Sequence, residues 1–423
     1  MSRQRRRDDP QRGRTMRRIA VIGGGVTGCS AAWHLKSRGL GDVHLFERDR
    51  LGCGTTWHSA GNITWYSNGE NGEQLLGDSD EQVLYLHELI SQLEGQTGLS
   101  SGWRETGRIY LARGAADMES YSTLHTLAQA SGVDTRLLSP KEAVSYHPLL
   151  NASALYGAYY NPRSGRLNPA GLVELYARSS RSLGVNIHEQ ARIRELSTES
   201  GRINGVVTAE GERLPFDDVV VCAGLWSAHL VGAQDIVLAQ GGCEHMYIIL
   251  EMPERVAPKT PSFLSATDLI YGREEVGGIL LGFFDTNASV IDVGALPDPF
   301  SSALLNENWD KIAPYLESAT ELFPAFKDAS VRSFINGPEA FTPDGKPFIG
   351  AAKGLPGLWL ATGMNSYGVT ISGASGHTIA DLVAGVPPRF PADIYRVDRF
   401  GEKARDPQWL RQSISDSPSG HFF

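Results

Sequence analysis

Short apolar runs and helical patterns alternate near the N-terminus. Residues 17–22 are a β-branched run, a glycine turn follows, and small and apolar residues recur at helical spacing up to Gly39. A second apolar run begins at Asp42, and Glu47 stands at its end. A strand, a helix and a second strand in this order predict a βαβ unit.

The middle of the chain follows a different pattern. We expect helices over residues 80–98, 140–148, 169–183 and 306–323, and strands over 107–113, through Ile187 and Ile193, and over 219–222. Runs rich in Tyr, Ile and Leu between residues 244 and 285 predict antiparallel strands of a second domain. After Pro343 the strand, glycine turn and helix pattern returns. The two domains must therefore be interleaved along the chain.

Composition limits the possible functions. A chain of 423 residues with 41% apolar residues suits two connected domains. Its net charge of -9 disfavours nucleic acid and anionic membranes as partners, and no apolar run is long enough to span a bilayer. Four scattered cysteines, without a Cys-x-x-Cys pair, predict neither a disulfide framework nor a metal site and fit the cytoplasm. We expect residues 1–16, rich in Arg, to be a disordered leader.

A glycine turn carries the first chemical signal. Gly23, Gly25 and Gly28 have the spacing of a dinucleotide-binding turn between a strand and a helix, and Glu47 ends the next strand, where it can accept ribose hydroxyls. The alternative is a purely structural turn. A returning strand that ends at Ala223 and Gly224, with a second glycine-rich turn from Gly363 to Gly368, favours FAD over NAD.

Five motifs occur in a fixed order: GTTWHSAG (54–61), NPRSGRLNPAGL (161–172), VVCAGLWS (220–227), GPEAFTPDGKPFIG (337–350) and TGMNSYGVTISGASG (362–376). In these motifs the chain resembles the amine-oxidising flavoproteins related to D-amino acid oxidase, and within them the flavin half of dimethylglycine and sarcosine dehydrogenases. The resemblance implies an α/β fold with a Rossmann-like FAD-binding domain (17–100, 155–235 and 335–390), an interleaved antiparallel-sheet substrate domain (101–154 and 236–334) and a C-terminal extension (391–423).

The resemblance also assigns the cofactor contacts. In the resembling dehydrogenases the His of the first motif is bonded covalently to the flavin 8α carbon, which implies the same for His58; the alternative is a core histidine. Related oxidases use a Cys, but Gly337 stands at that position here. The implied FAD contacts are Gly23, Gly25, Val26, Thr27, Gly28, Glu47, Arg48, Thr55, Thr56, His58, Ser59, Ala60, Gly61, Ile193, Ala223, Gly224, Trp226, Gly363, Met364, Asn365, Ser366, Tyr367 and Gly368, the last five at a helix start facing the flavin pyrimidine.

Two strands of the substrate domain supply the expected catalytic groups. His245 in EHMYIIL and Tyr271 in DLIYGRE match the family's active-site strands, although packing roles are the alternative for both. Arg273 is a candidate for a substrate carboxylate, or an exposed residue at a sheet edge. Asn62 stands where the dehydrogenases have an apolar residue, so we expect it to reshape the substrate side of the pocket.

These residues imply oxidation of a C–N bond in an N-methylated or other secondary or tertiary amino acid or amine. A hydride passes to flavin N5, and hydrolysis of the iminium releases formaldehyde. The alternatives are an oxidase of a primary or cyclic amino acid and a non-catalytic flavin-carrying subunit. Oxygen or an electron-transfer protein accepts the electrons. The chain stops where the long dehydrogenases continue into a folate-binding half, which fits either a stand-alone enzyme or a truncation.

Overall fold

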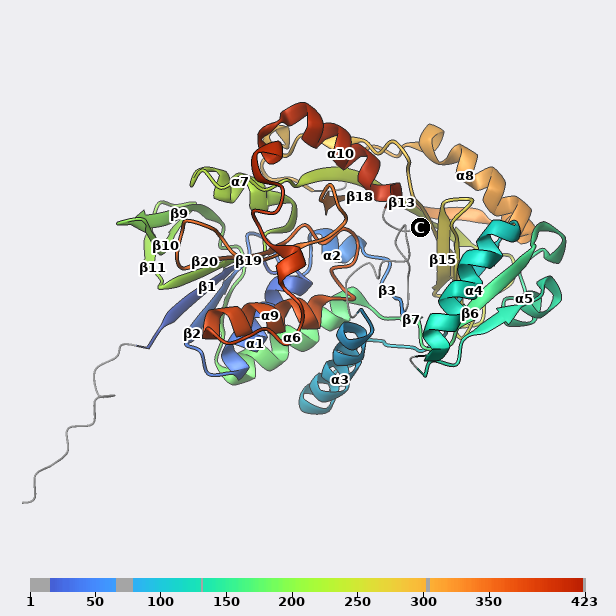
Figure 1. The fold of residues 1–423 in the computed structure, drawn as a ribbon, viewed down its shortest axis with the longest axis horizontal. Helices are drawn as coiled ribbons and strands as arrows, with labels where there is room; N and C mark the ends of the chain where they lie inside the picture. The colour runs from blue at the N-terminus through green and yellow to red at the C-terminus, as the bar shows by residue number, and fades with distance from the viewer. Residues whose placement is uncertain (1–15, 66–78, 131, 302–304, 421–423) are drawn as a thin grey trace, which may run out of the picture.

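Two large β-sheets form the framework of this protein, whose structure is a computed structural model that describes residues 16–65, 79–130, 132–301 and 305–420 (Figure 1). The expected leader lies outside the described residues except for Met16. None of the described helices is long and apolar enough to cross a membrane. One sheet lies at the N-terminal end of the molecule in Figure 1 and the other at the opposite end, with α2 (Thr55–His58) between them.

The first sheet has six strands drawn from both ends and the middle of the chain. Its strands are parallel except for the last pair at one edge, which is antiparallel. In spatial order they are β19 (Phe348–Ala351), β20 (Leu358–Thr362), β12 (Asp218–Val221), β1 (Arg18–Ile22), β2 (Asp42–Phe46) and β8 (Asn186–His188). The expected βαβ unit is the centre of this sheet, and the returning strands pair beside it.

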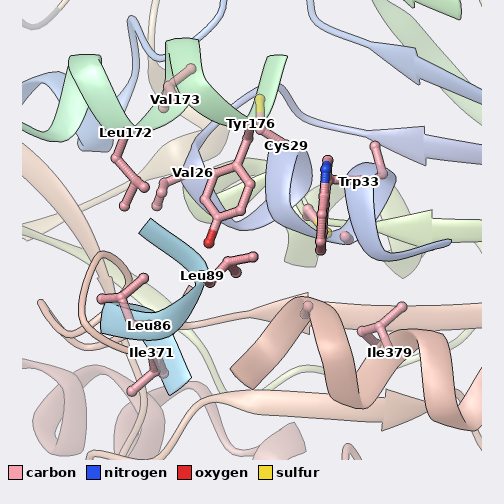
Figure 2. Packing of buried hydrophobic residues seen from close by; sticks show 14 of the residues in the cluster. Val26, Cys29, Trp33, Leu86, Leu89, Leu172, Val173, Tyr176, Ile371 and Ile379 are labelled. Carbon is pink, nitrogen blue, oxygen red and sulfur yellow. The ribbon is translucent and has the colours of Figure 1, made fainter. Parts of the chain in front are cut away.

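Helices cover one face of this sheet. They are α1 (Val26–Ser37), α3 (Ser79–Thr97), α6 (Pro169–Leu183) and α9 (Ser372–Ala384), and their apolar faces meet in one core (Figure 2). The prediction for α6 is confirmed at both ends, because Asn168 accepts hydrogen bonds from the first-turn amides and Gly184 ends the helix with a φ of 84°. The opposite face carries β9 (Ile193–Glu199), β10 (Arg202–Thr208), β11 (Arg213–Pro215) and α7 (Ser227–Gly232).

The second sheet has nine strands and is largely antiparallel. Its order is β17 (Val290–Ile291), β13 (Gly241–Glu251), β16 (Gly278–Phe283), β15 (Ile270–Glu275), β14 (Ser262–Ser265), β4 (Arg108–Ala112), β6 (Gly157–Asn161) and β5 (Arg136–Leu138), with β18 (Ser330–Phe341) also paired to β13. α5 (Pro140–Tyr146) and α8 (Trp309–Leu322) pack on one face, while α4 (Ala115–Ala130) packs on the other. A short ribbon of β3 (Asn62–Ile63) and β7 (Gly165–Arg166) and the C-terminal α10 (Pro407–Gly420) complete the fold.

Alternation along β4 separates the two faces of this sheet. Ile109 and Leu111 enter the core under α5 and α8, whereas Tyr110 and Ala112 lie on the α4 face. Three details differ from the sequence-based expectation. β6 pairs in this sheet although residues 155–235 were assigned to the other domain, β18 extends across the expected boundary at 335, and β14 runs parallel to β4. Strand pairing across the folded chain decides these details, and local periodicity carries no information about it.

Candidate active site

The glycine turn between β1 and α1 is packed too tightly for side chains at two of its positions. Gly23 has a φ of 105°, and a Cβ there would lie 2.4 Å from the carbonyl oxygen of Cys222 at the end of β12. A Cβ on Gly28 would lie 1.8 Å from the carbonyl oxygen of Gly23. At Gly25, by contrast, the nearest atom to a Cβ is Thr56 Oγ1 at 3.2 Å. The backbone at Gly25 is therefore the side of the turn that a ligand can approach.

Glu47 and Thr56 fix the position of this turn. Glu47 Oε2 accepts a hydrogen bond from the amide of Gly24 at 2.7 Å, and its other oxygen accepts one from the amide of Asp49 at 2.9 Å. Burial raises the pKa of Glu47 above its usual value. Thr56 Oγ1 accepts a hydrogen bond of 3.1 Å from the amide of Val26, in the first turn of α1. The motif around His58 is thus tied directly to the start of the nucleotide-binding helix.

Residues that follow β2, β8 and β12 meet beside this turn. The guanidinium of Arg48 lies 4.2 Å from the centre of the Trp226 ring. Gly224, at the end of β12, has a φ of 51° and no atom within 4 Å of a Cβ, so the backbone there is open to a ligand. Ile193 begins β9 and packs in the same core as Phe46, next to Glu47 in the chain. These expected cofactor contacts lie at one edge of the sheet.

The segment from Gly363 to Gly368 lies above the start of α1. A Cβ on Gly368 would lie 3.2 Å from Met364 Cβ and 4.0 Å from Thr27 Oγ1. Asn365 and Ser366 have φ values of 47° and 64°, and Asn365 Oδ1 accepts a hydrogen bond of 2.8 Å from the amide of Thr342. The segment is a turn and not a helix start, because α9 begins only at Ser372. Side-chain bonds to Thr342 hold this turn outside the helical conformation.

These residues fit a bound FAD. The open backbone at Gly25 and Gly224 suits the close approach of a pyrophosphate, and the N-terminus of α1 favours its negative charge. The acid that ends β2 and the stacked Arg48 and Trp226 stand where the ribose and adenine of a dinucleotide bind in folds of this type.

A cavity of about 300 Å³ lies between this cofactor region and the α4 face of the second sheet. His58 lines it and is 6% exposed, and burial lowers the pKa of its imidazole to about 4. Thr55 Oγ1 donates a hydrogen bond of 2.9 Å to the carbonyl of Pro338, which joins α2 to β18. The expected residues at the cavity wall are His58, Ser59, Ala60, Gly61, Asn62, His245, Tyr271, Ser366 and Tyr367.

His245 and Tyr271 meet in this cavity. His245 Nε2 and Tyr271 Oη are hydrogen-bonded at 3.1 Å, although β13 and β15 are separated by β16. The tyrosine reaches across because β16 has Gly282 at this point, where a Cβ would lie 2.0 Å from Tyr271 Cζ. Burial raises the pKa of Tyr271 far above its usual value, so its phenol stays protonated and can donate to a neutral imidazole.

Arg273 forms its polar contacts with other residues of the chain. It is not among the described residues that line the cavity. It is buried rather than exposed at a sheet edge, it donates to the carbonyl oxygens of Ala60 and Glu274, and it forms an ion pair with Glu275. The arginine at the cavity wall is Arg108 on β4, accompanied by Tyr110. Alternation in the run GRIYLAR places these two side chains on one face of a strand, a signal that our sequence analysis did not use.

Glu339 is another buried residue at the cavity wall, and it was not among the predicted site residues. Glu339, on β18, is 6% exposed and accepts a hydrogen bond from Ser366 Oγ. Its motif was recognised, but only the fold brings β18 under the turn that carries Ser366. Asn62, predicted to shape the substrate side, lines the cavity, and its carbonyl accepts a hydrogen bond of 3.4 Å from Thr370 Oγ1.

Two curated proteins are similar to this chain over nearly all of its length. The chain is 31% identical over 408 residues to human mitochondrial sarcosine dehydrogenase, covering 94% of this chain and 43% of that protein. It is 30% identical over 404 residues to the mouse mitochondrial pyruvate dehydrogenase phosphatase regulatory subunit, covering 94% and 45%. The chain thus spans less than half the length of these two curated relatives.

The fold has solved counterparts. The structure of L-proline dehydrogenase from P. horikoshii matches with a TM-score of 0.78 at 24% identity, over 92% of this chain and 98% of that one, which confirms the expected fold class. The family model described as FAD dependent oxidoreductase matches residues 18–382. This range contains the glycine turn, His58, His245 and Tyr271, and the chain belongs to the FAD dependent oxidoreductase family.

Proposed function

We propose that this protein catalyses FAD-dependent oxidation of a C–N bond in an N-methylated or other secondary or tertiary amino acid or amine. The observation that carries the proposal is the hydrogen-bonded pair of His245 and Tyr271, placed in the same cavity as His58. A nucleotide-binding turn alone indicates a cofactor and does not indicate which substrate is oxidised. A base and a phenol beside the cofactor site suit a substrate that must lose a proton before it is oxidised.

The cavity favours the reactive form of an amine. Alkyl amines are protonated in water, and only the neutral amine has the lone pair that assists loss of hydride from the adjacent carbon. Apolar walls, including Leu264, Ala266 and Phe284, disfavour the charged form, and His245 can accept its proton. FAD supplies the two-electron acceptor. Water then adds to the iminium carbon, so an N-methyl substrate gives formaldehyde and the demethylated amine.

His58 is the proposed attachment point of the flavin. An imidazole with a pKa of about 4 is neutral near pH 7, and the neutral nitrogen is the nucleophilic form. The residues that follow it, Ser59, Ala60 and Gly61, are small and line the same cavity, so they leave room beside the imidazole. Related oxidases attach the flavin through a cysteine at the position of Gly337. In this chain the residue is glycine, so that attachment point is absent at this position.

Two other functions remain to be tested against this one. The similarity to a phosphatase regulatory subunit favours, as a second candidate, a flavin-carrying subunit without amine oxidation. The similarity in fold to L-proline dehydrogenase keeps oxidation of a cyclic or primary amino acid as the rival within the same chemistry.

The products of turnover separate these functions. The purified holoprotein is incubated with N-methyl, primary and cyclic amino acids, with either oxygen or an artificial dye as electron acceptor. Formaldehyde from N-methyl substrates supports the proposal. Ammonia from primary amino acids, or a cyclic imine from proline-like substrates, supports the rival enzyme. No product from any amine with either acceptor refutes both and leaves the flavin-carrying subunit.

A further inference from the structure

Arg108 is a buried cation at the cavity wall. The residue is 6% exposed and lines the cavity, and its Nε has no hydrogen-bond partner among the residues that the structure describes. No salt bridge of Arg108 occurs within the described ranges. The centre of the Tyr110 ring lies 5.3 Å from the guanidinium carbon of Arg108.

The carboxylates around the cavity are engaged elsewhere. Asp117 accepts hydrogen bonds from the amides of Arg113 and Gly114 and from Thr267. Glu339 accepts one from Ser366. Two further buried acids of the same sheet are also paired, Asp268 with Arg113 and Glu274 with Arg166. The positive charge of Arg108 is thus not matched by any of these groups.

Tyr110 adds a second donor at the same place. Its hydroxyl is buried at the cavity wall, and the described part of the chain gives it no hydrogen-bond partner. Tyr110 follows Arg108 by two residues on β4, so both side chains lie on the cavity face of the sheet. Burial raises the pKa of Tyr110, which keeps this hydroxyl protonated and able to donate.

A buried charge and a buried hydroxyl without partners are costly, and proteins retain such groups where a ligand completes them. A planar guanidinium matches a carboxylate, to which it can donate two parallel hydrogen bonds. We propose that Arg108 and Tyr110 bind the carboxylate of the substrate, so that the protein selects N-substituted amino acids over neutral amines. This inference rests on the proposed function for the identity of the ligand.

The strand register places this acid-binding site apart from the catalytic pair. Tyr271 and Tyr110 both align with Leu264 of β14, so they lie two strands apart in one row, about 10 Å between their Cα atoms. Tyr271 leans over Gly282 towards His245, away from β4. The amine and carboxylate of the substrate are therefore held by different parts of the cavity wall.

The test measures carboxylate binding separately from catalysis. Acetate, propanoate and butanoate lack the amine, and their binding to the holoprotein is followed by the change in flavin absorbance. Arg108→Met should weaken binding of the best of these by about tenfold to a hundredfold, the loss of a charge-assisted hydrogen bond. Tyr110→Phe should weaken it less, and Arg108→Lys should retain part of it. Arg104→Met, an exposed arginine just before β4, is the matched control and should bind like the wild type.

Turnover and thermal melting complete the test. Arg108→Met should lower kcat/KM for N-methyl amino acids by a larger factor than it lowers kcat/KM for neutral N-methyl amines, with a Tm equal to or above that of the wild type. The inference is overturned if the wild type binds no carboxylate, if Arg108→Met and Tyr110→Phe both bind carboxylates like the wild type, or if acidic and neutral amines lose turnover equally. If no amine is oxidised by the wild type, the proposed function fails, while carboxylate binding still decides the role of Arg108.

Discussion

Gly337 lies against the imidazole of His58, where a Cβ at residue 337 would stand 2.7 Å from His58 Cγ and 2.8 Å from its Cβ. The same glycine is the direct partner of His245 in the pairing of β18 with β13. One residue without a side chain thus connects the proposed flavin attachment point with the proposed catalytic strand. In the proposed function, the attachment of the flavin and the reaction of the substrate therefore involve the same short stretch of backbone.

Removal of the His58 imidazole should abolish covalent attachment of the flavin. We expect yellow colour to stay with the acid-precipitated wild-type protein and to pass into the supernatant from His58→Ala. The reason is that a noncovalent flavin loses its site when the protein unfolds. A colourless pellet from the wild-type holoprotein would refute the covalent link, whatever the variant does.

Gly337→Ala should reduce the same attachment although the chain still contains His58. The added methyl group overlaps the imidazole and displaces it, so the fraction of flavin retained in the acid pellet should fall several-fold relative to the wild type. Gly232→Ala is the control, because a Cβ there meets no atom within 4 Å. Equal retention in Gly337→Ala and in the wild type would show that the position of His58 does not limit attachment.

Attachment should depend on pH in a way that follows from the burial of His58. Its pKa is lowered from 6.5 to about 4, so the nucleophilic neutral form is lost only as the pH falls towards 4. When FAD is added to protein produced without flavin, the initial rate of linkage should therefore be level from about pH 8 down to about pH 5. A rate that falls by half near pH 6.5 would instead indicate a solvated imidazole.

The fold of the cofactor region follows from local sequence, whereas the contacts within the site do not. The glycine turn, the acid at the end of the next strand and the caps of α6 each belong to one continuous stretch of strand, turn or helix, so spacing along that stretch predicts them. The contact of Gly337 with His58 and the hydrogen bond between Ser366 and Glu339 join segments that no single strand, turn or helix contains. Such contacts exist only after the strands have paired.

The two arginines of the second sheet show the same limit. Arg273 and Arg108 both lie on strands and are both buried, and from the sequence Arg273 was a candidate for binding a substrate carboxylate or an exposed residue at a sheet edge. In the folded protein, Arg273 donates a hydrogen bond to the carbonyl oxygen of Ala60 and forms an ion pair with Glu275. Arg108 forms no ion pair with any described residue, and its Nε has no hydrogen-bond partner among them. Which arginine is available to a ligand depends on acceptors that come from other segments, and no periodicity in the sequence encodes them.

Tyr271→Phe should slow reduction of the flavin by about tenfold to a hundredfold, because it removes the hydroxyl that holds His245 and keeps the ring. Gly282→Ala should have a similar effect, since its methyl group would overlap the Tyr271 ring and separate it from His245. Tyr247→Phe is the control and should react like the wild type, because Tyr247 lies on β13 two residues after His245 and is not among the described residues that line the cavity. Stopped-flow absorbance measures all four rates. Wild-type rates in both Tyr271→Phe and Gly282→Ala would remove the pair from the mechanism.

The most direct test of amine oxidation is to mix the wild-type holoprotein with N-methyl amino acids in the absence of oxygen and to record the flavin absorbance. The account predicts that at least one of them bleaches the oxidised flavin fully within a single turnover, and that Tyr271→Phe bleaches more slowly with the same substrate. If no N-methyl amino acid and no other secondary or tertiary amine bleaches a flavin that dithionite does reduce, the proposed oxidation of such amines is wrong.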